Sequence, residues 1–464
     1  MKKRLLTIIL VSLSFSVSFS QTSMVADINV GSANADLAYF TTMNGVMCFR
    51  ANDGVNGHEL WKYDGINPPS LVADLNPSGD SWPFDLVEFN GKLYFAADDG
   101  STGFEMWEYD GVNPPTLFAD IEASGNGAFY NGAYFTVFNN KLYFRANDGV
   151  AGSELWEYDG TNPPTLFADL AVGVNGSAPI GFTVFNNKLH FNAQDESTGV
   201  PRLWEYDGTN PPSLVSTAIV TQGANDNMME MNGKLYFGGS DGTNGFELWE
   251  YDGVNPPTMV ADIVAGGSSW PAPKMVFDNK LYFRAQTVNP NETWVYDGFN
   301  APSQEMTISL GGLEFNGGYY FSYDDGVNGR ELGIYDGINP PSFVADINPT
   351  GHSIPAPVQV FNNKLYFIAD NGTNGRELWV YDDVNSVSEN EENISVKLFP
   401  NPSSSNISIE TEAEINEVFI FDLYGSLVQQ ENQHTFSVEN LSSGVYIMNI
   451  KTNKGISRSR FIKE

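Results

Sequence analysis

The sequence predicts an all-β chain: an eight-bladed β-propeller that is closed by an N-terminal strand and followed by a small Ig-like β-sandwich. The main observation is a unit of strand, Gly-rich loop and strand that recurs about every 45 residues, the length of one four-stranded blade. The composition agrees, since 13% aromatic and 17% charged residues with 45 Gly and 25 Pro favour short strands joined by turns. Each unit ends in a Tyr-Asp pair, with its tyrosine at Tyr63, Tyr109, Tyr158, Tyr206, Tyr251, Tyr296, Tyr335 and Tyr381.

Each unit contains four strand signals in the same order. The first strand, for example Phe182–Phe185, ends at Asn-Asn, Asn-Gly or Asp-Asn, which tolerate positive φ and form two-residue hairpin turns. The second, such as Lys141–Phe144, is rich in Leu, Tyr and Phe, which predicts burial on both faces between neighbouring blades. An Asp-Gly-x-x-Gly loop leads to the third strand (Glu154–Asp159), and a Gly-x-Asn-Pro-Pro turn leads to the fourth (Thr116–Ile121).

The two ends of the repeat predict how the ring closes. Met24–Ile28 resembles a fourth strand without its first three, and the last unit, Val358–Asp383, supplies three strands without a fourth. The N-terminal strand would therefore complete the last blade and leave no exposed edge. An open array and a seven-bladed ring with one stray unit are the alternatives. The fourth and sixth units are irregular, which we interpret as drift rather than as a functional sector.

Residues 1–20 are predicted to be a Sec signal peptide. Lys2, Lys3 and Arg4 precede an apolar run, and small residues flank a cleavage point before Gln21. No later segment has the length of apolar sequence that a membrane span needs. The predicted organisation is a signal peptide at 1–20, the propeller at 21–383, a polar acidic linker at 384–394 and a final domain at 395–464.

The net charge of −34 at pH 7 argues against some partners. Such a surface repels phosphate backbones, so nucleic acid is not expected, whereas cations, neutral glycans and basic protein patches remain candidates. The single cysteine, Cys48, lies in a predicted strand and excludes an intrachain disulfide. We interpret it as a small buried residue rather than as a nucleophile.

The last 70 or so residues alternate apolar and polar positions in short strands, which predicts a small β-sandwich. Their motifs are LFPNPSSS at Leu398–Ser405, FDLYGSLV at Phe421–Val428 and LSSGVYIMNI at Leu441–Ile450, followed by a basic ending. This order of motifs resembles the type A C-terminal sorting domain of the bacterial type IX secretion system. The resemblance implies that the type IX machinery is a partner and that the protein is released or held at the outer cell surface; the alternative is an ordinary sandwich module. The motif residues are Phe399, Pro400, Asn401, Pro402, Gly444 and Tyr446.

The repeats themselves resemble the bacterial ELWxxDGT-type repeat proteins, as in GRELWVYDD at Gly375–Asp383. Their layout is also similar to that of kelch-like propellers, although the kelch double glycine is mostly replaced by Ala-Asp or Ala-Asn. The resemblance supports a propeller. It carries no catalytic residues over to this chain.

Acidic residues recur at two positions of the unit and are the first candidates for chemistry. Because repetition relates them, most are expected to be structural: an aspartate before glycine accepts backbone amides of its own turn, and a glutamate at a strand start accepts neighbouring amides. Calcium at some aspartate loops is the alternative for a cofactor. The glutamates are Glu59, Glu105, Glu154, Glu247, Glu331 and Glu377, and the aspartates are Asp53, Asp99, Asp148, Asp241 and Asp325.

The loops between the fourth strand of one unit and the first strand of the next carry the best functional signal. They are polar, rich in Gly, Ser and Asn, and at one position they hold a residue that differs between units. Exposed aromatic rings in such loops stack on sugar rings or anchor a protein partner; alternatively, they fill gaps between blades. The candidate ligand-binding residues are Trp82, Phe129, Tyr130 and Trp270.

These observations predict a secreted or surface-displayed, non-enzymatic binding or adhesion protein that recognises a glycan or a protein without a cofactor. One alternative is a polysaccharide-degrading enzyme, a lyase or glycosidase, at the mouth of the propeller channel. Such an enzyme needs a cluster of titrating groups that other blades lack. A further alternative is a structural component of a surface layer. The irregular units supply only Asp195, Glu196, Arg202 and Glu292 for such a cluster.

Overall fold

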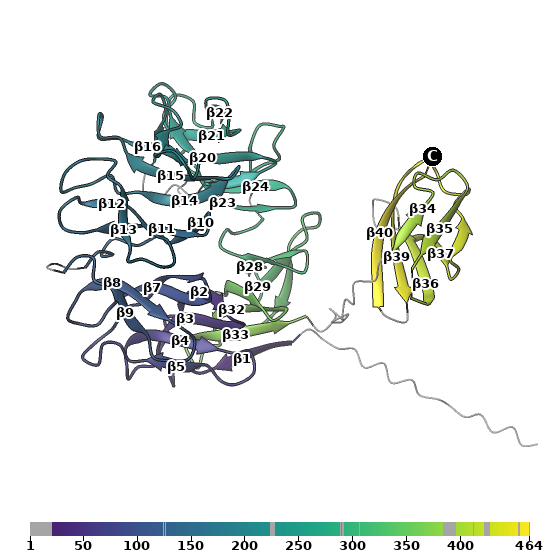
Figure 1. Ribbon diagram of the computed structural model, residues 1–464. Helices are drawn as coiled ribbons and strands as arrows, with labels where there is room; N and C mark the ends of the chain where they lie inside the picture. Colours follow the sequence, from purple (N-terminus) through teal and green to yellow (C-terminus); the bar gives the residue numbers. More distant parts are fainter. Residues whose placement is uncertain are drawn as a thin grey trace, which may run out of the picture. The chain divides into compact units, whose positions relative to one another are not determined.

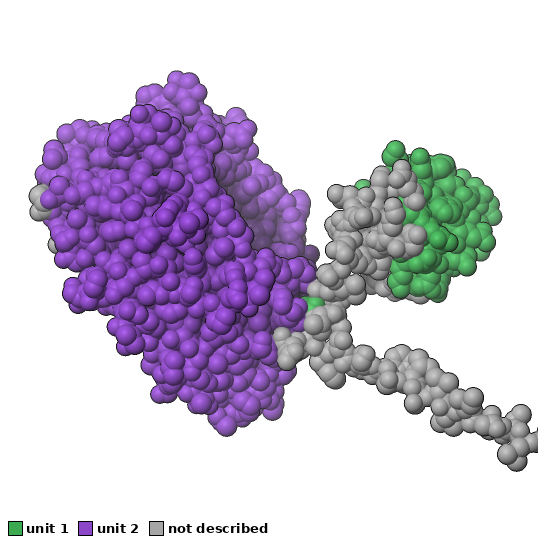
Figure 2. Space-filling model, turned by 60° about the horizontal axis from the view of Figure 1, so that its bottom comes forward, with its two compact units in different colours: residues 1–19, 383–464 green, residues 20–382 purple. Residues whose placement is uncertain are grey.

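The computed structural model describes residues 21–463 except for 124, 126, 223–227, 288, 290–291, 306, 384–395, 412, 422–426 and 453–454. Within the described residues all helical and strand elements are of one kind, β-strands (Figure 1). The chain divides into two compact units, one spanning residues 20–382 and the other containing residues 383–464 (Figure 2). The predicted signal peptide at 1–20 and the predicted linker at 384–394 lie outside the described residues.

The larger unit is built from antiparallel sheets of consecutive strands. The first sheet contains β2 (Ala38–Met43), β3 (Val46–Asn52), β4 (His58–Tyr63) and β5 (Ser70–Ala73). The second contains β6 (Phe84–Phe89), β7 (Lys92–Asp98), β8 (Phe104–Tyr109) and β9 (Thr116–Ala119). The third contains β10 (Thr136–Phe138), β11 (Lys141–Asn147), β12 (Ser153–Tyr158) and β13 (Thr165–Ala168). The fourth contains β14 (Ile180–Phe185), β15 (Lys188–Gln194), β16 (Pro201–Tyr206) and β17 (Ser213–Leu214).

The next sheets follow the same order. One contains β18 (Val220–Thr221) and β19 (Met229–Met231), both paired with β20 (Lys234–Ser240), then β21 (Glu247–Tyr251) and β22 (Thr258–Ala261). Another contains β23 (Ala272–Phe277), β24 (Lys280–Ala285), β25 (Glu292–Tyr296) and β26 (Ser303–Gln304). The one after it contains β27 (Leu313–Phe315), β28 (Gly318–Asp324), β29 (Arg330–Tyr335) and β30 (Ser342–Ala345).

The N-terminal strand completes the last sheet of this unit, as the repeat predicted. That sheet has the order β1 (Gln21–Ala26), β33 (Arg376–Asp382), β32 (Lys364–Asp370) and β31 (Ala356–Phe361). The strand β1 begins three residues before the expected Met24, and Gln21 pairs antiparallel with Asp382. Figure 1 shows β1 beside β33 although they lie at opposite ends of the unit's sequence. These four-stranded sheets and this closure make the larger unit a β-propeller.

Aromatic side chains fill the space between neighbouring sheets. In most sheets a tyrosine of the second strand meets a tyrosine of the next sheet's third strand, as in Tyr143 and Tyr206, whose ring centroids are 5.7 Å apart; Cys48 and His190 take its place in the first and fourth sheets. The pair formed by Tyr366 and Tyr63, at 5.8 Å, joins the last sheet to the first. Because each sheet is covered on both faces, its second strand is buried almost throughout, as the lack of alternation in the sequence predicted.

The smaller unit consists of two antiparallel sheets around one core. The first contains β34 (Lys397–Phe399), β35 (Asn406–Glu410) and β38 (Thr435–Ser437). The second has the order β37 (Leu427–Glu431), β36 (Ile415–Phe421), β39 (Gly444–Thr452) and β40 (Gly455–Lys463). Buried residues of both sheets, among them Ile407 and Met448, share this core.

The motif residues of the smaller unit hold its last strand. The Asn401 side chain donates to the carbonyl of Arg460 at 3.0 Å and accepts from the N–H of Ile462 at 2.9 Å. Gly444 pairs with Lys463, and the ring of Tyr446 stacks on Phe461 at 5.5 Å. Pro400 and Pro402 both follow cis peptide bonds, and Phe399 before the first of them is exposed.

Candidate functional site

Buried glutamates hold the loops that join one sheet to the next. Glu247 accepts the N–H of Ile263 at 3.0 Å, the N–H of Ser269 at 3.0 Å and the Ser269 hydroxyl at 2.6 Å. Each loop is thereby tied at both ends to the start of a third strand. Glu377 holds only the first end of its loop, through the amides of Ile28 and Asn29. We call these residues the anchoring glutamates; they are Glu59, Glu105, Glu154, Glu247, Glu331 and Glu377.

The anchoring glutamates have the structural role that the sequence predicted. All six are 0% exposed. Burial raises the pKa of Glu105 to about 6 and that of Glu377 to about 7, against the lowering effect of the amides that each carboxylate accepts. A carboxylate enclosed by its own loop has no open side for a substrate. These groups therefore fix the loops rather than act on a ligand.

The residue after each anchored serine takes a left-handed backbone conformation. Trp82 has a φ of 46° and Trp270 a φ of 51°, and the N–H of each donates to a third-strand carbonyl, that of His58 at 3.0 Å and that of Phe246 at 3.2 Å. Ala178 and Ile354 repeat this geometry with φ of 49° and 46°. A bulky residue in this region costs on the order of 1 kcal/mol relative to glycine. The side chains are thus held outward, and Trp82 is 39% and Trp270 45% exposed.

The surroundings of Trp82 form a mixed aromatic and charged surface, which we call the Trp82 surface. The indole stacks on the His58 ring at 3.8 Å, and the Arg50 guanidinium lies 4.9 Å from the indole and 5.0 Å from the ring of Tyr39. Burial lowers the pKa of Arg50, while Tyr39 and nearby aspartates raise it. This arrangement presents two rings with a cation beside them.

Two carboxylates border the Trp82 surface through His58. Nδ1 of His58 lies 2.9 Å from Oδ1 of Asp80, and Nε2 lies 3.4 Å from Oδ2 of Asp36. The N–H of His58 also donates to Asp80 at 2.7 Å. One arginine, Arg50, and two carboxylates therefore lie around the Trp82 ring.

The surroundings of Trp270 are different. The indole stacks on Phe246 at 4.5 Å and forms one wall of a hollow of about 240 Å³. Within the described residues, neither Lys274 nor Arg284 in this hollow has an ion-pair partner. Burial and the nearby Arg284 charge lower the pKa of Lys274. We call this cavity the Trp270 hollow; it is lined by Gln222, Trp270, Ala272, Lys274, Arg284, Ala285 and Gln286.

Phe129 and Tyr130 occupy a loop that turns differently from the others. The N–H of Phe129 donates to the Phe104 carbonyl at 3.0 Å, as Trp82 does to His58, but its ring is fully buried against Phe135 at 5.5 Å and Phe144 at 5.8 Å. Tyr130 beside it is 65% exposed. Phe129 is therefore part of the core, and it is left out of the surface proposed below.

Sequence reasoning missed a second pair of exposed rings. Tyr39 and Tyr134 both have a φ of 56°, and each lies beside an arginine, with Arg145 5.5 Å from the Tyr134 ring. The signal was available, because Ala-Tyr-Phe occurs at 38–40 and at 133–135, each followed by a strand containing Phe-Arg-Ala-Asn. These tyrosines extend the aromatic surface next to Trp82.

The aspartates of the Gly-rich loops are engaged in their own turns. Asp325 accepts the N–H groups of Val327 at 2.9 Å and Asn328 at 2.8 Å, and these bonds lower its pKa. No group of three or more His, Cys, Asp or Glu that could hold a metal occurs among the described residues. Calcium binding stays a prediction. The same backbone contacts recur at Asp53, Asp99, Asp148 and Asp241.

The charged residues of the irregular fourth unit replace an anchoring glutamate. The Nε of Arg202 lies 3.2 Å from Oδ2 of Asp195, and its Nη1 donates to the Thr217 carbonyl at 2.6 Å. The arginine thus donates to loop carbonyls where a glutamate would accept loop amides. In the sixth unit Glu292 accepts from the Thr287 hydroxyl at 2.5 Å.

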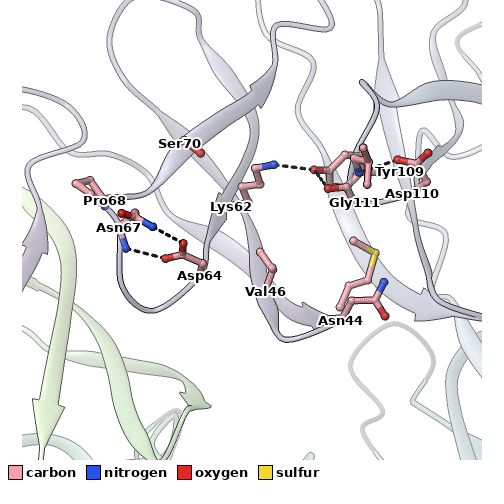
Figure 3. A pocket seen from close by; sticks show the side chains of 12 residues that line it. Asn44, Val46, Lys62, Asp64, Asn67, Pro68, Ser70, Tyr109, Asp110 and Gly111 are labelled. Carbon is pink, nitrogen blue, oxygen red and sulfur yellow. Dashed lines mark hydrogen bonds between the residues drawn. The ribbon is translucent and has the colours of Figure 1, made fainter.

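A second hollow, of about 410 Å³, lies between the first two sheets (Figure 3). Lys62 points into it and donates to the Tyr109 hydroxyl at 3.0 Å. In the next sheets the residue that corresponds to Lys62 is a glutamate, and it pairs with a lysine of the hairpin, as Glu108 does with Lys92 at 2.9 Å. The hollow is lined by Met43, Asn44, Val46, Lys62, Asp64, Asn67, Pro68, Ser70, Tyr109, Asp110, Gly111 and Val112.

Departures from the repeat open this second hollow. Val46 stands where the next sheet has Lys92, and Met43 stands where it has Phe89. Cys48 replaces the tyrosine that otherwise contacts the next sheet; it is fully buried, and burial raises its pKa to about 12. The thiol is therefore the protonated core group that the sequence predicted.

The comparisons with known proteins identify the smaller unit. Residues 397–464 match the family described as a secretion system C-terminal sorting domain. This confirms the predicted sorting domain: the protein interacts with the type IX machinery and is exported to the cell surface or the extracellular space. The described part of the chain contains no helix long and apolar enough to cross a membrane. No curated protein matches the chain.

Solved structures similar to this chain include peptidases and lectins. A chain from a structural study of two prolyl endopeptidases matches at 10% identity and a TM-score of 0.42, over 91% of this chain and 55% of the endopeptidase. A lectin from Burkholderia pseudomallei matches at 13% identity and a TM-score of 0.38, over 62% and 92%. The six-bladed propeller lectin of Aleuria aurantia matches at 13% identity and a TM-score of 0.28, over 58% of this chain and 93% of the lectin. The chain thus spans little more than half of the endopeptidases, and such distant likenesses carry no inference about function.

Proposed function

We propose that this chain is a secreted, non-enzymatic glycan-binding propeller. Its larger unit, residues 21–383, is an eight-bladed ring of ELWxxDGT-type repeats. A signal peptide at 1–20 directs its export, and a linker at 384–394 joins it to an Ig-like sorting domain at 395–464. The propeller presents its ligand-binding residues on the loops between blades.

The observation that supports this function is the pair of exposed indoles on rigid loops. Trp82 and Trp270 are both held in left-handed backbone conformations, although glycine would fit there at lower cost. The anchored serine before each of them fixes the loop through a buried glutamate. Rigid, half-exposed indoles offer flat apolar faces at a low cost in entropy, and the C–H faces of sugar rings stack on such surfaces.

Polar groups beside each ring would orient the sugar. Arg50 and His58 flank Trp82, and Lys274 and Arg284 flank Trp270. The exposed rings of Tyr39 and Tyr134 add further stacking surface beside Trp82, and Tyr130 is exposed on the loop of Phe129. A few polar groups around an apolar platform are the usual composition of a small-ligand site.

The proposal is tested by binding of the intact chain to a panel of soluble and insoluble glycans. Saturable binding is expected, and Trp82→Ala combined with Trp270→Ala should weaken it about tenfold or more. Ile354→Ala is the matched control, because Ile354 has the same backbone geometry without a ring. Sugar release by the wild-type chain would indicate an enzyme instead. Absence of binding to every glycan would overturn the proposal in favour of a protein partner, or of a surface-layer component if the chain self-associates.

A further inference from the structure

The lysines of this acidic chain are mostly neutralised by neighbouring carboxylates. The net charge is −34, and the hairpin lysines form ion pairs within their own sheets, as Lys141 does with Glu157 at 3.0 Å. Lys280, in the same sheet as the Trp270 hollow, pairs with Asp278 at 3.3 Å. Several other described cations also have no carboxylate partner, among them Arg50, Lys62 and Arg145. Two such cations in one cavity, however, are exceptions that need an explanation.

Lys274 and Arg284 are two such exceptions, and they meet in one cavity. Arg284 pairs across the sheet with Ala272, and a bulge between Pro273 and Met275 changes the direction of the strand at Lys274. Both side chains line the Trp270 hollow, which has no carboxylate among its described lining residues. Two like charges close together destabilise each other, so the fold alone gains nothing from this arrangement.

The combination of these two cations is particular to one sheet. At the position of Arg284 the first and third sheets also have an arginine, Arg50 and Arg145, whereas the second sheet has Ala96 and the sheet before has Gly238. The residue that corresponds to Lys274 is Leu86 in the second sheet and Val358 in the last sheet. The shared scaffold therefore does not require either charge, and both lie beside one of the two exposed indoles.

We infer that the Trp270 hollow binds the acidic group of an anionic glycan, the carboxylate of a uronic acid or a sulfate ester on a sugar. This inference rests on the proposed glycan binding and adds the class of sugar. The Arg284 guanidinium can donate two parallel hydrogen bonds to such a group, and the Lys274 ammonium supplies a point charge beside it. The face of Trp270 packs against the sugar ring, and Gln286 at the rim offers an amide to its hydroxyls.

The Trp82 surface does not share this preference. There the Arg50 cation beside the indole is accompanied by two carboxylates, those of Asp36 and Asp80, which face His58. An acidic sugar placed on that ring would approach like charges, whereas a neutral sugar would not. We therefore expect the Trp270 hollow alone to distinguish acidic from neutral glycans.

The test uses glycan pairs that differ only in charge. Polygalacturonate is compared with its methyl ester, and dextran sulfate with dextran, by binding of the intact chain at low and at 0.5 M salt. We expect the acidic member of at least one pair to bind about tenfold or more tightly than its neutral partner. This difference should shrink at high salt, because screening weakens exposed charges.

Variants locate the effect. Lys274→Gln combined with Arg284→Gln should remove the preference for the acidic member while binding of neutral glycans persists; Lys280→Gln is the matched control and should change neither. Circular dichroism confirms that each variant is folded. Equal or weaker binding of both acidic members, or a preference that survives the double substitution, would overturn the inference. If neutral glycans still bind when the inference fails, the proposed glycan-binding function stands without the preference for acidic sugars. If the chain binds no glycan at all, both the proposed function and this inference are wrong.

Discussion

Trp82 and Trp270 occupy the same position of the repeat, yet their neighbours differ in charge. Both follow an anchored serine, both have a positive φ near 50°, and both are a little under half exposed. Trp82 lies next to His58, which contacts two aspartates, whereas Trp270 lies in a hollow with Lys274 and Arg284. The comparison teaches that the repeat determines the backbone and that the departures from it determine the charges around each indole.

The two regions also separate the residues that hold a loop from those that face solvent. Glu59 and Glu247, under the two loops, accept the same amides and the same serine hydroxyl at 2.6 Å. On the solvent side of these loops, the two regions have the indole in common but differ in the charged groups beside it. Changes below the loop should therefore affect both indoles alike, and changes above it should affect one.

The largest effect is expected from Glu247→Ala. It leaves the Ile263 N–H without its acceptor and removes the short bond from the buried Ser269 hydroxyl, while the Ser269 N–H keeps the Phe246 carbonyl at 2.9 Å; this should lower the free energy of unfolding by about 2–4 kcal/mol. Trp270 would also lose its fixed orientation. Urea denaturation followed by tryptophan fluorescence measures the loss. Glu250→Gln, at a partly exposed ion pair with Lys234, is the control and should cost less than about 1 kcal/mol; similar losses in both variants would contradict the anchoring role.

The next effect concerns pH and Glu377, where the N-terminal strand closes the ring. Burial raises the pKa of Glu377 to about 7, despite the amides of Ile28 and Asn29 that it accepts. Because the folded state then holds the proton more tightly than the unfolded state, this contribution to stability is present at low pH and lost as the pH rises through about 7. We expect it to lower the free energy of unfolding by about 1–3 kcal/mol between pH 5 and pH 8.

Glu377→Gln should remove this part of the pH dependence, since the amide does not titrate. Denaturation curves at several pH values for both chains give the difference directly. The matched comparison is Glu108→Gln, which removes a partner of Lys92 near the surface. Parallel pH profiles for wild type and Glu377→Gln would show that this carboxylate titrates normally in the folded chain.

Local patterns predicted most of the fold. Asn139 and Asn140 in a two-residue turn, and Leu-Tyr-Phe strands buried on both faces, act over short distances in the sequence, so the sheets and their closure could be predicted. Closure involves long-range pairing, but the incomplete units at the two ends revealed it. The strand β1 was expected at Met24–Ile28 and lies at Gln21–Ala26, because the carboxylate of Glu377 takes the N–H of Ile28.

The candidate site was harder to predict because it depends on how side chains from separate segments meet. Phe129 turns inward through a tight loop in which the N–H of Gly132 donates to the Phe129 carbonyl at 2.8 Å, and no spacing in the sequence indicates this. The Trp270 hollow requires a bulge that changes the direction of Lys274 toward Arg284, ten residues later in the chain. Trp270 itself was predicted from its loop, since a half-exposed ring after an anchored serine is a local feature.

A smaller effect should separate the two indoles from each other. Trp270→Ala should weaken binding of acidic glycans about tenfold and leave neutral glycans nearly unaffected, whereas Trp82→Ala should do the reverse. The reason is that each ring has a different set of charges beside it. Titration calorimetry with matched acidic and neutral oligosaccharides measures both. Equal losses on both ligands for both variants would mean that the indoles form one continuous site.

The smallest effect concerns the second hollow, where the departures from the repeat remove an ion pair. Val46→Lys combined with Lys62→Glu should restore the pairing that Lys92 and Glu108 make in the next sheet. A partly exposed pair contributes little, so a double-mutant cycle should give a coupling of about 0.2–1 kcal/mol in the free energy of unfolding. Each single substitution is the control for the other. Zero coupling would mean that the new lysine and glutamate do not pair, because Tyr109, which now accepts from Lys62 at 3.0 Å, keeps them apart. The hollow would then result from the packing between the two sheets and not from the missing ion pair.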